Sequence, residues 1–251
     1  MLIDHWPLAG LRLTTPRLEL RLPDDEELAA LADLAAEGVH APDRMPFTVP
    51  WSDAPGPRRA RSVVQYHWLR RGDWTPDHWS LNLAVFRDGR PAGTQELSAD
   101  DFGVLGVVGS GSWLGLRHQG QGVGTEMRAA ILHLAFAGLG AREAVTAAFE
   151  DNARSRAVSR KLGYAPDGVR RVVSRGRPAT LHRLRLARAD WRPDPDLPVT
   201  LTGLDPCLPL FGVASRAGAA GQAPADGVAG QAPADGTGPA VSPGVPGRGG
   251  P

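Results

Sequence analysis

The sequence predicts one mixed α/β domain, of the α+β kind, followed by an unfolded tail. Strand and helix patterns follow the order β-α-α-β-β-β-α-β-α-β-β, which is not the regular alternation of a doubly wound sheet. Of the 251 residues, 42% are hydrophobic, enough to bury a sizeable core. Near the C-terminus the composition shifts to Ala, Gly, Pro, Ser and Val, which cannot form one. We expect a domain over residues 1–191, an extension packed on it over 192–212 and a disordered tail over 213–251.

The first part of the chain contains a strand, two helices and a long loop. Leucines at alternate positions of residues 16–22 predict a half-buried strand. Asp24 and Glu27 have the spacing of a capping box, so a helix is expected to begin there. A proline-rich segment over 39–57 forms a long loop, which in a compact domain is often functional, and residues 58–72 form the second helix.

The middle of the chain turns tightly between two strands and then reaches a third strand and a helix. Residues 79–86 alternate apolar side chains, and Asp88-Gly89 is a type I′ hairpin signal that leads into a strand over 90–99. A short strand is expected over 110–116 and a helix over 122–139. The buried face of that helix is expected to carry Met127, Ile131, Leu134 and Gly138.

The last elements are a strand, a helix and a hairpin. Residues 142–149 read as a strand, and a helix over 151–163 begins at a cap residue, Asp151 or Asn152. Segments 164–173 and 179–188 flank an Arg-Gly turn and predict a final hairpin. The sequence "GQAPADG" then occurs twice, at 221–227 and 230–236, as expected of a low-complexity tail.

Composition excludes several classes of protein. A net charge of +1 argues against a dedicated nucleic-acid binder, and no run of about 18 apolar residues is present for a membrane span. The N-terminus lacks the pattern of a secretory signal, and the single cysteine, Cys207, excludes an internal disulfide framework. The seven histidines are scattered without metal-ligand spacing, so no metal is expected. We expect a cytoplasmic location; a homo-oligomer is compatible with the sequence.

A glycine-rich loop at the start of the helix over 122–139 is the strongest functional signal. It lies between a strand and a helix, where unpaired N–H groups and the helix dipole favour an anion. No Lys-Ser or Lys-Thr follows the glycines, which disfavours a P-loop. The spacing "GQGVG" also differs from that of the dinucleotide fingerprint. The segment from Gln119 to Gly124 instead fits Q/R-x-x-G-x-G/A; the same pattern also fits two residues earlier, from Arg117.

This pattern resembles the acyl-CoA loop of the GNAT (Gcn5-related) N-acyltransferases. The segment "TPRLELR" resembles the opening strand of the branch that contains ribosomal-protein N-terminal acetyltransferases, and "DNARSRAVSRKLGY" resembles that branch's Asn-x-x-Ser helix. Together with "EGVHAPDRMPF", "SGSWLGL" and "TEMRAA", the folded region is similar to an actinobacterial subgroup, and some acyltransferases of this kind use succinyl-CoA. The resemblance covers residues 11–191 and implies a mostly antiparallel twisted sheet with about four helices, in which the fourth and fifth strands splay apart.

The resemblance also implies an acyl-CoA site built on the loop. Backbone groups of Leu114, Gly115 and Leu116 would hold the pantetheine arm, and one N–H there would polarise the thioester carbonyl. Asn152 would also bond to this arm, although asparagine is equally a favoured helix cap. The residues that would hold the diphosphate are Gln119, Gly120, Gln121, Gly122, Val123, Gly124 and Thr125. Residues 154–188 contain eleven Lys or Arg and one acid, which suits CoA phosphates as well as a solvated basic face.

Catalytic roles are less well defined by the sequence. Ser155 matches the residue proposed in this branch to protonate the leaving thiolate, and also reads as a plain helical serine. The acceptor amine must lose a proton before attack. Glu96 is a candidate base, and so are Asp101 and Glu150, yet each also reads as an ordinary surface acid. Tyr164 is expected to pack rather than act as an acid.

The acceptor is not fixed by the sequence. Trp113 fits either an acceptor-pocket wall or plain core, while His40 and Asp43 are placed in the long loop where an acceptor would bind. A protein N-terminus, a lysine and a small-molecule amine all remain open.

The function hypotheses therefore centre on CoA. The leading one is N-acyl transfer from acetyl-CoA or succinyl-CoA, without a metal. The alternative is a non-catalytic acyl-CoA-binding sensor or scaffold, because the base is unassigned. A nucleotide-binding enzyme is third.

Overall fold

The computed structural model describes residues 1–214, so residues 215–251, which hold nearly all of the predicted tail, lie outside the described part. One sheet of nine strands forms the centre of the molecule, in the order β7-β8-β6-β5-β4-β3-β2-β1-β9. Neighbouring strands are antiparallel except β5 and β6. The strands are β1 Arg12–Thr14, β2 Leu18–Arg21, β3 His78–Arg87, β4 Arg90–Asp100, β5 Val107–Leu114, β6 Glu143–Phe149, β7 Ala165–Ser174, β8 Arg177–Ala187 and β9 Thr200–Thr202.

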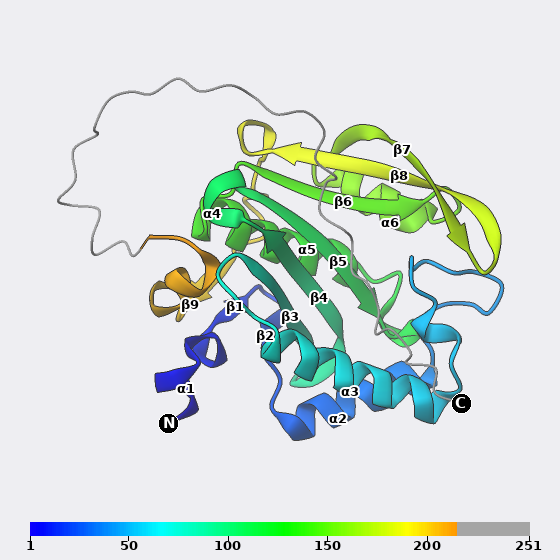
Figure 1. The fold of residues 1–251 in the computed structure, drawn as a ribbon, viewed down its shortest axis with the longest axis horizontal. Coiled ribbons are helices and arrows are strands. Elements are labelled where there is room, and N and C mark those ends of the chain that lie inside the picture. Colours follow the sequence, from blue (N-terminus) through cyan, green and yellow to red (C-terminus); the bar gives the residue numbers. More distant parts are fainter. Residues whose placement is uncertain (215–251) are drawn as a thin grey trace.

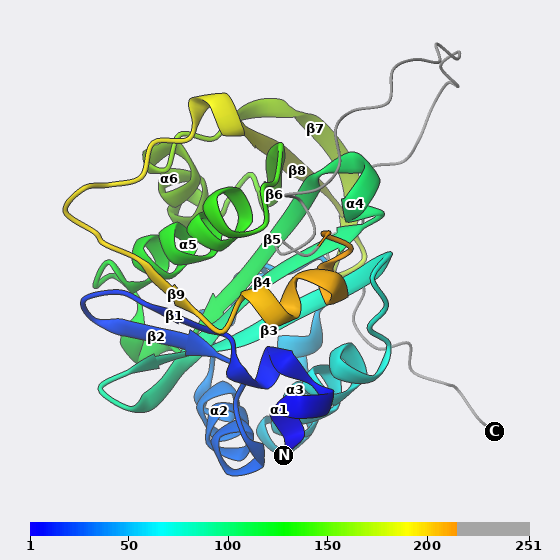
Figure 2. The ribbon, with the colours of Figure 1, turned by 90° about the vertical axis from the view of Figure 1, so that its left-hand side faces the viewer.

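Helices cover both faces of the sheet (Figure 1). One face carries α2 and α3, which pack together over β3 and β4, and the other carries α5 and α6 (Figure 2). The helices are α1 Leu2–His5, α2 Asp25–Glu37, α3 Gly56–Gly72, α4 Phe102–Leu105, α5 Val123–His133 and α6 Ala153–Lys161. This arrangement is the mixed α/β fold that the sequence predicts, and no helix of the described residues is long and apolar enough to cross a membrane.

Local chemistry explains where the helices begin. The Asp24 side chain accepts from the Glu27 N–H at 2.8 Å, and the Glu27 carboxylate accepts from the Asp24 N–H at 3.0 Å, which completes the predicted capping box. Helix α5 begins at Val123, after Gly122 adopts a left-handed φ of +80° as its N-cap. Its last turns continue as the π-helical segment Leu134–Gly138, so the predicted helix over 122–139 is present and changes its hydrogen-bond pattern near its end.

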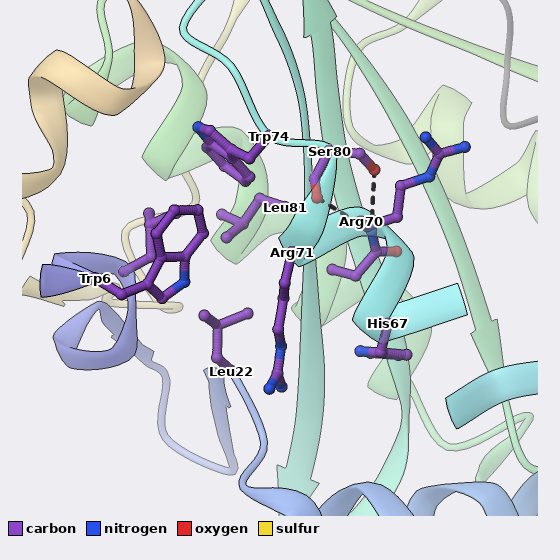
Figure 3. Close-up of a pocket in the computed structure, with 10 residues that line it drawn as sticks. Trp6, Leu22, His67, Arg70, Arg71, Trp74, Ser80 and Leu81 are labelled. Atoms are coloured by element: carbon purple, nitrogen blue, oxygen red, sulfur yellow. Dashed lines mark hydrogen bonds between the residues drawn. The ribbon is translucent and has the colours of Figure 1, made fainter. Parts of the chain in front are cut away.

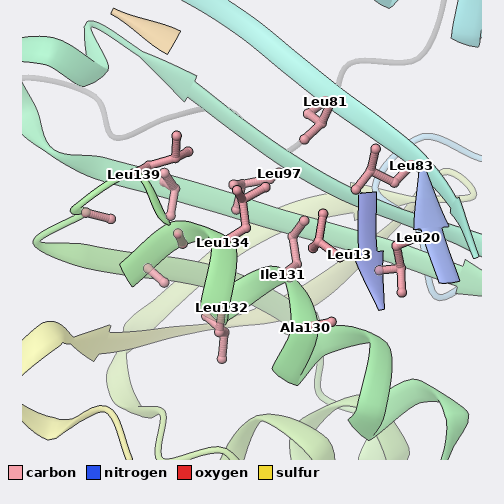
Figure 4. Close-up of a cluster of buried hydrophobic side chains, with 14 of the residues drawn as sticks. Leu13, Leu20, Leu81, Leu83, Leu97, Ala130, Ile131, Leu132, Leu134 and Leu139 are labelled. Atoms are coloured by element: carbon pink, nitrogen blue, oxygen red, sulfur yellow. The ribbon is translucent and has the colours of Figure 1, made fainter. Parts of the chain in front are cut away.

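The core lies mainly between the sheet and α5 (Figure 4). Met127, Ile131 and Leu134 are at most 3% exposed and pack against buried leucines of β1 to β4, as their spacing predicts. The segment after β8 joins the same core: β9 pairs with β1, and Cys207, Leu208 and Phe211 are buried. A second, smaller core joins α2, α3 and the opposite face of the sheet.

Candidate active site

Strands β5 and β6 run parallel but remain paired over only three residues. The register joins Val107 to Glu143 and ends where Gly109 meets Val145. Beyond that point the strands separate, and this separated part, residues 110–114 and 146–149, is called the strand gap below. The glycine loop, residues 119–124, follows β5 at the open end of the gap.

Alternate residues of β5 point their backbone groups into the strand gap. The Gly115 N–H donates to the Ala92 carbonyl, so the groups of Ser110, Ser112 and Leu114 point the other way, toward β6. Consistent with this, the Ser110 carbonyl accepts from Thr146 Oγ1 of β6 at 3.0 Å. Leu114 therefore lies on the gap edge, as its predicted role requires.

Leu116 does not lie on this edge. The strand expected over 110–116 ends at Leu114, and Leu116 belongs to the 3-10 turn Leu116–His118. Its N–H donates to the Gly38 carbonyl at 3.3 Å, so this N–H is not available to a ligand in the strand gap. Ser112, which the sequence analysis did not select, lies on the gap edge together with Leu114. The two-residue alternation of a strand, counted back from Leu114, leads to Ser112.

The glycine loop presents a row of free donors. The backbone N–H groups of Gly120, Gln121, Gly122, Val123 and Gly124 have no hydrogen-bond acceptor within the part of the chain that the structure describes. Gly120 and Gly122 have left-handed φ angles of +75° and +80°, which set the direction of these N–H groups. Only glycine adopts such angles without strain. Unpaired N–H groups at a helix N-terminus bind anions, so the loop has the chemistry of a phosphate site.

Long side chains hold the loop in place. Gln119 Nε2 donates to the carbonyls of Leu114 at 3.0 Å and Val39 at 2.8 Å, which ties the loop to the gap edge. Arg17 Nη1 donates to the Gln121 carbonyl at 3.1 Å. Thr125 is the third residue of α5, and its N–H donates to the Gly122 carbonyl at 3.0 Å.

Asn152 and Ser155 lie at the start of α6. Asn152 is the N-cap, and its Oδ1 accepts from the Ser155 N–H at 3.2 Å. The Ser155 hydroxyl has no hydrogen-bond partner among the described residues, and its carbonyl accepts from Ser159 Oγ at 3.1 Å. Helix α6 in turn contacts α5, whose Arg128 donates to Ser159 Oγ at 3.0 Å across the interface.

Glu96 lies on the sheet face that α3 covers. Its carboxylate accepts from Ser80 Oγ at 3.0 Å and from the Tyr66 hydroxyl at 3.5 Å. It stands beside Gly111 of β5, where an added Cβ would lie 3.1 Å from Glu96 Oε2, so glycine keeps this approach open. Asp101 precedes α4, at the opposite end of β5 from the glycine loop.

An aromatic row covers the same face. The rings of Phe47 and Trp51, both in the long loop, lie tilted against each other with centroids 5.1 Å apart, and the ring of Trp51 lies 5.9 Å from that of Trp113 in β5. His40 Nε2 is 2.6 Å from Ser52 Oγ, which fixes the loop internally. Trp113 thus packs against the second core while remaining partly exposed.

An ion pair joins the long loop to the final hairpin. Arg175, at the turn between β7 and β8, donates to Asp53 Oδ2 at 2.9 Å and to the Pro42 carbonyl at 3.0 Å. The hydrogen bond from Arg175 holds the pKa of Asp53 below its usual value. The pair therefore ties the long loop, which carries Phe47 and Trp51, to the turn between β7 and β8.

A cavity of about 10 Å³ lies between α3, β3 and the N-terminal segment that carries Trp6 (Figure 3). That volume holds about one water molecule, too little for a substrate. Trp6, Trp74 and His67 contribute to its wall, and the buried His67 Nδ1 has no hydrogen-bond partner within residues 1–214. Burial, with a smaller effect of Arg71, lowers the pKa of His67 to about 3, so its ring is neutral at pH 7. Within residues 1–214 no cluster of His, Cys, Asp or Glu has the arrangement of a metal site.

Several solved structures share the fold. A ribosomal L7/L12 α-N-protein acetyltransferase, RimL, in complex with coenzyme A is 20% identical, with a TM-score of 0.55 over 68% of this chain and 94% of that one. Mycobacterium smegmatis RimJ, in complex with a CoA disulfide, is 16% identical, with a TM-score of 0.55 over 72% and 88%. A GCN5-related N-acetyltransferase from Brucella melitensis is 21% identical, with a TM-score of 0.55 over 72% and 80%.

The amino-acid sequence also matches the model of a known protein family. The model of the acetyltransferase (GNAT) domain matches residues 17–165, which include the glycine loop, the strand gap and α6. The chain therefore belongs to the GNAT acetyltransferase family.

Proposed function

We propose that this protein is a CoA-dependent N-acyltransferase that transfers an acetyl or succinyl group from acyl-CoA to an amine. The observation that carries the proposal is the row of five N–H groups at residues 120–124, which find no acceptor in the described part of the chain and lie at the open end of the strand gap. A phosphate group satisfies such donors, and a free strand edge suits the amides of a pantetheine arm.

Each site residue has a role in binding the acyl donor. Residues 119–125 hold the diphosphate, and the edge of β5 at Ser112 and Leu114 holds the acyl arm, with one N–H polarising the thioester carbonyl. The Asn152 amide bonds to the arm. These roles are supported by the unpaired loop donors and by the position of α6 beside α5.

The reaction transfers the acyl carbon from sulfur to nitrogen. The amine lone pair forms the new C–N bond, the C–S bond breaks, and the sulfur leaves as a thiolate. Ser155, whose hydroxyl has no partner among the described residues, supplies a proton to the thiolate. Glu96 accepts the proton of the amine through water. The aromatic row of Phe47, Trp51 and Trp113 forms the wall of the acceptor pocket.

Two measurements test the proposal. Acetyl-CoA at 100 times its Kd is expected to raise the melting temperature by about 5 °C or more, because it binds the native state. Release of free CoA thiol in the presence of an amine panel then reports transfer. Binding without thiol release would identify a non-catalytic acyl-CoA-binding protein, and no thermal shift with any CoA ligand would overturn both readings.

Two glycine variants separate binding from folding. Gly120 and Gly89 have φ angles of +75° and +73°, and an added Cβ at either position meets no atom within 4 Å. Alanine therefore costs each site a similar amount, about 1–2 kcal/mol. Only Gly120→Ala places a methyl group among the loop donors, so only this variant is expected to lose the thermal shift. Equal shifts in the two variants would remove the loop from the binding site.

A further inference from the structure

The carboxylate of Glu96 is held by two hydroxyl groups, one on each of its oxygens. Ser80 Oγ of β3 donates to Oε1 at 3.0 Å, and the Tyr66 hydroxyl of α3 donates to Oε2 at 3.5 Å. The two donors come from different elements, a strand and a helix. Together they fix both the position and the plane of the carboxylate, as is needed of a group that takes part in a reaction.

Each of these hydroxyls also accepts a hydrogen bond from a nitrogen donor. Asn82 Nδ2 donates to Ser80 Oγ at 2.9 Å and to the Ser80 carbonyl at 3.2 Å. The Arg70 guanidinium, which has no acceptor atom, hydrogen-bonds to the Tyr66 hydroxyl. A hydroxyl carries one proton, so the protons of both hydroxyls are left to point at Glu96. The network therefore matches a carboxylate, which only accepts hydrogen bonds.

The two nitrogen donors are buried and anchored. Asn82 is 4% exposed, and Arg70 is 9% exposed and also donates to Asp73 Oδ2 at 2.9 Å. Tyr66 and Arg70 lie one turn apart on α3, and the guanidinium carbon is 5.2 Å from the centre of the tyrosine ring. A buried polar network is costly unless its members are paired, and this one converges on a single partly exposed acid, Glu96.

The carboxylate of Glu96 lies beside the strand gap. Glu96 is opposite Gly111 in the register of β4 and β5, and Gly111 is flanked by Ser110 and Ser112, whose backbone groups point toward β6. A Cβ at Gly111 would lie 3.1 Å from Glu96 Oε2, so the missing side chain lets the carboxylate approach the backbone of β5. The acid is therefore next to the strand edge that is proposed to hold the acyl arm.

We infer that Ser80 and Tyr66 are positioning residues that hold Glu96 in place as the proton acceptor of the transfer reaction, which rests on the proposed function. Asn82 and Arg70 act one step further away, by directing the two hydroxyl protons. The acceptor ammonium gives a proton to Glu96 through water, and the lone pair that is freed attacks the thioester carbon. A carboxylate that has lost one of its two donors adopts other orientations, so a smaller fraction of molecules is ready to react.

Transfer kinetics of the full chain test this role. Release of CoA thiol from acetyl-CoA is followed with a peptide that has a free α-amine, with Nα-acetyl-lysine amide and with benzylamine, and the best acceptor is then used throughout. Ser80→Ala is expected to lower kcat about tenfold, and Tyr66→Phe, which removes the longer hydrogen bond, about threefold. The KM for the amine and the Kd for acetyl-CoA are expected to stay within about twofold of the wild-type values, because neither residue binds a substrate.

A double-variant cycle shows whether Ser80 acts through the acid. Glu96→Gln alone is expected to lower kcat about 100-fold or more. Adding Ser80→Ala to Glu96→Gln is expected to change kcat by less than about twofold further, because the group that Ser80 positions is already lost. Ser98 lies opposite Ser80 in the register of β3 and β4, and Ser98→Ala leaves both hydrogen bonds to Glu96 in place. This control is expected to keep the wild-type kcat.

Wild-type activity separates the two proposals. If the wild-type protein releases no thiol with any of the three acceptors, the proposed function fails. If it transfers acetyl groups but Ser80→Ala and Tyr66→Phe both keep the wild-type kcat, only the positioning role fails. Losses that multiply in the double variant, or a KM that rises as much as kcat falls, would also overturn this role. If Ser80→Ala does not fold, Tyr66→Phe, which keeps the ring and its packing, provides the same cycle with Glu96→Gln.

Discussion

The buried carboxylate of Glu126 holds Arg17 against the glycine loop. Arg17 Nε donates to Glu126 Oε2 at 2.7 Å, while Thr15 Oγ1 donates to Oε1 of the same carboxylate at 2.6 Å. The Nη1 atom of Arg17 donates to the Gln121 carbonyl. One acid on α5 therefore links the segment between β1 and β2 to the loop proposed to bind phosphates.

Neutralising this acid is expected to weaken both the fold and the loop. Glu126→Gln removes the charge that Arg17 pairs with, and the lost charged hydrogen bonds lower the free energy of unfolding by about 1–3 kcal/mol. Urea denaturation measures this, and titration with acetyl-CoA is expected to show weaker binding. Glu143→Gln, which breaks an exposed pair with Arg185, is expected to cost less than about 1 kcal/mol. Similar losses in the two variants would contradict a special role for Glu126.

His67 is expected to make the protein less stable in acid. Its folded pKa of about 3 lies below the ordinary value of 6.5, so between these limits the unfolded chain binds a proton that the folded chain does not. Stability from this group is complete above pH 6.5 and falls as the pH drops toward 3. At pH 5 the loss amounts to about 2 kcal/mol. His67→Gln removes the titration, so its unfolding free energy is expected to change less than that of the wild type between pH 7 and pH 5. An identical pH dependence in both proteins would contradict the assignment.

Cys207 is expected to be inert in the native protein. It is buried, and burial raises the pKa of its thiol to about 11. At pH 8 only about one thiol in a thousand is then a thiolate, the form that reacts. Because the chain contains one cysteine, labelling with a thiol reagent reports unfolding alone. Labelling as rapid in buffer as in urea would contradict the burial, whereas slow labelling permits thiol-release assays without background from the protein.

The pair between Arg175 and Asp53 is expected to restrain the long loop. Arg175→Gln removes the charge that ties the hairpin turn to Asp53, and faster amide hydrogen exchange is expected over residues 40–54. High salt is expected to have the same effect on the wild type, because the pair is partly exposed. Arg183→Gln changes the same hairpin away from the loop and is the matched control. Unchanged exchange in Arg175→Gln would show that packing of Phe47 and Trp51 alone holds the loop.

Local signals in the sequence were sufficient for most of the fold. The capping box at Asp24, the Asp88-Gly89 turn and the glycines before α5 each fix a short-range geometry, and each is present as predicted. Strands β1 and β9 were missed because three residues are too few for an alternation pattern to emerge. Strand β1 pairs with β2 and with β9, and β9 pairs with β1, so β9 depends on a partner far away in the sequence.

The candidate site was predicted less completely than the fold. The glycines before α5 and Asn152 before α6 are residue types that favour a loop or a helix cap, so the sequence predicts their positions. The sequence around Arg128, in contrast, does not distinguish it from an exposed arginine on a helix. Arginine is mostly exposed in proteins, so its burial between β5 and α6 follows only from the three-dimensional packing. The neighbouring serines are equally ordinary in sequence.

The two ends of the sheet differ in how they avoid self-association. An unpaired strand edge can recruit a strand of another molecule and start aggregation. At one end β9 covers β1 and, being only three residues long, offers little edge of its own. At the other end β7 is long but carries exposed Arg170 and Arg171 and a register break between Pro166 and Val169. Loss of the segment after β8 is therefore expected to expose β1 as an edge strand that can pair with another molecule.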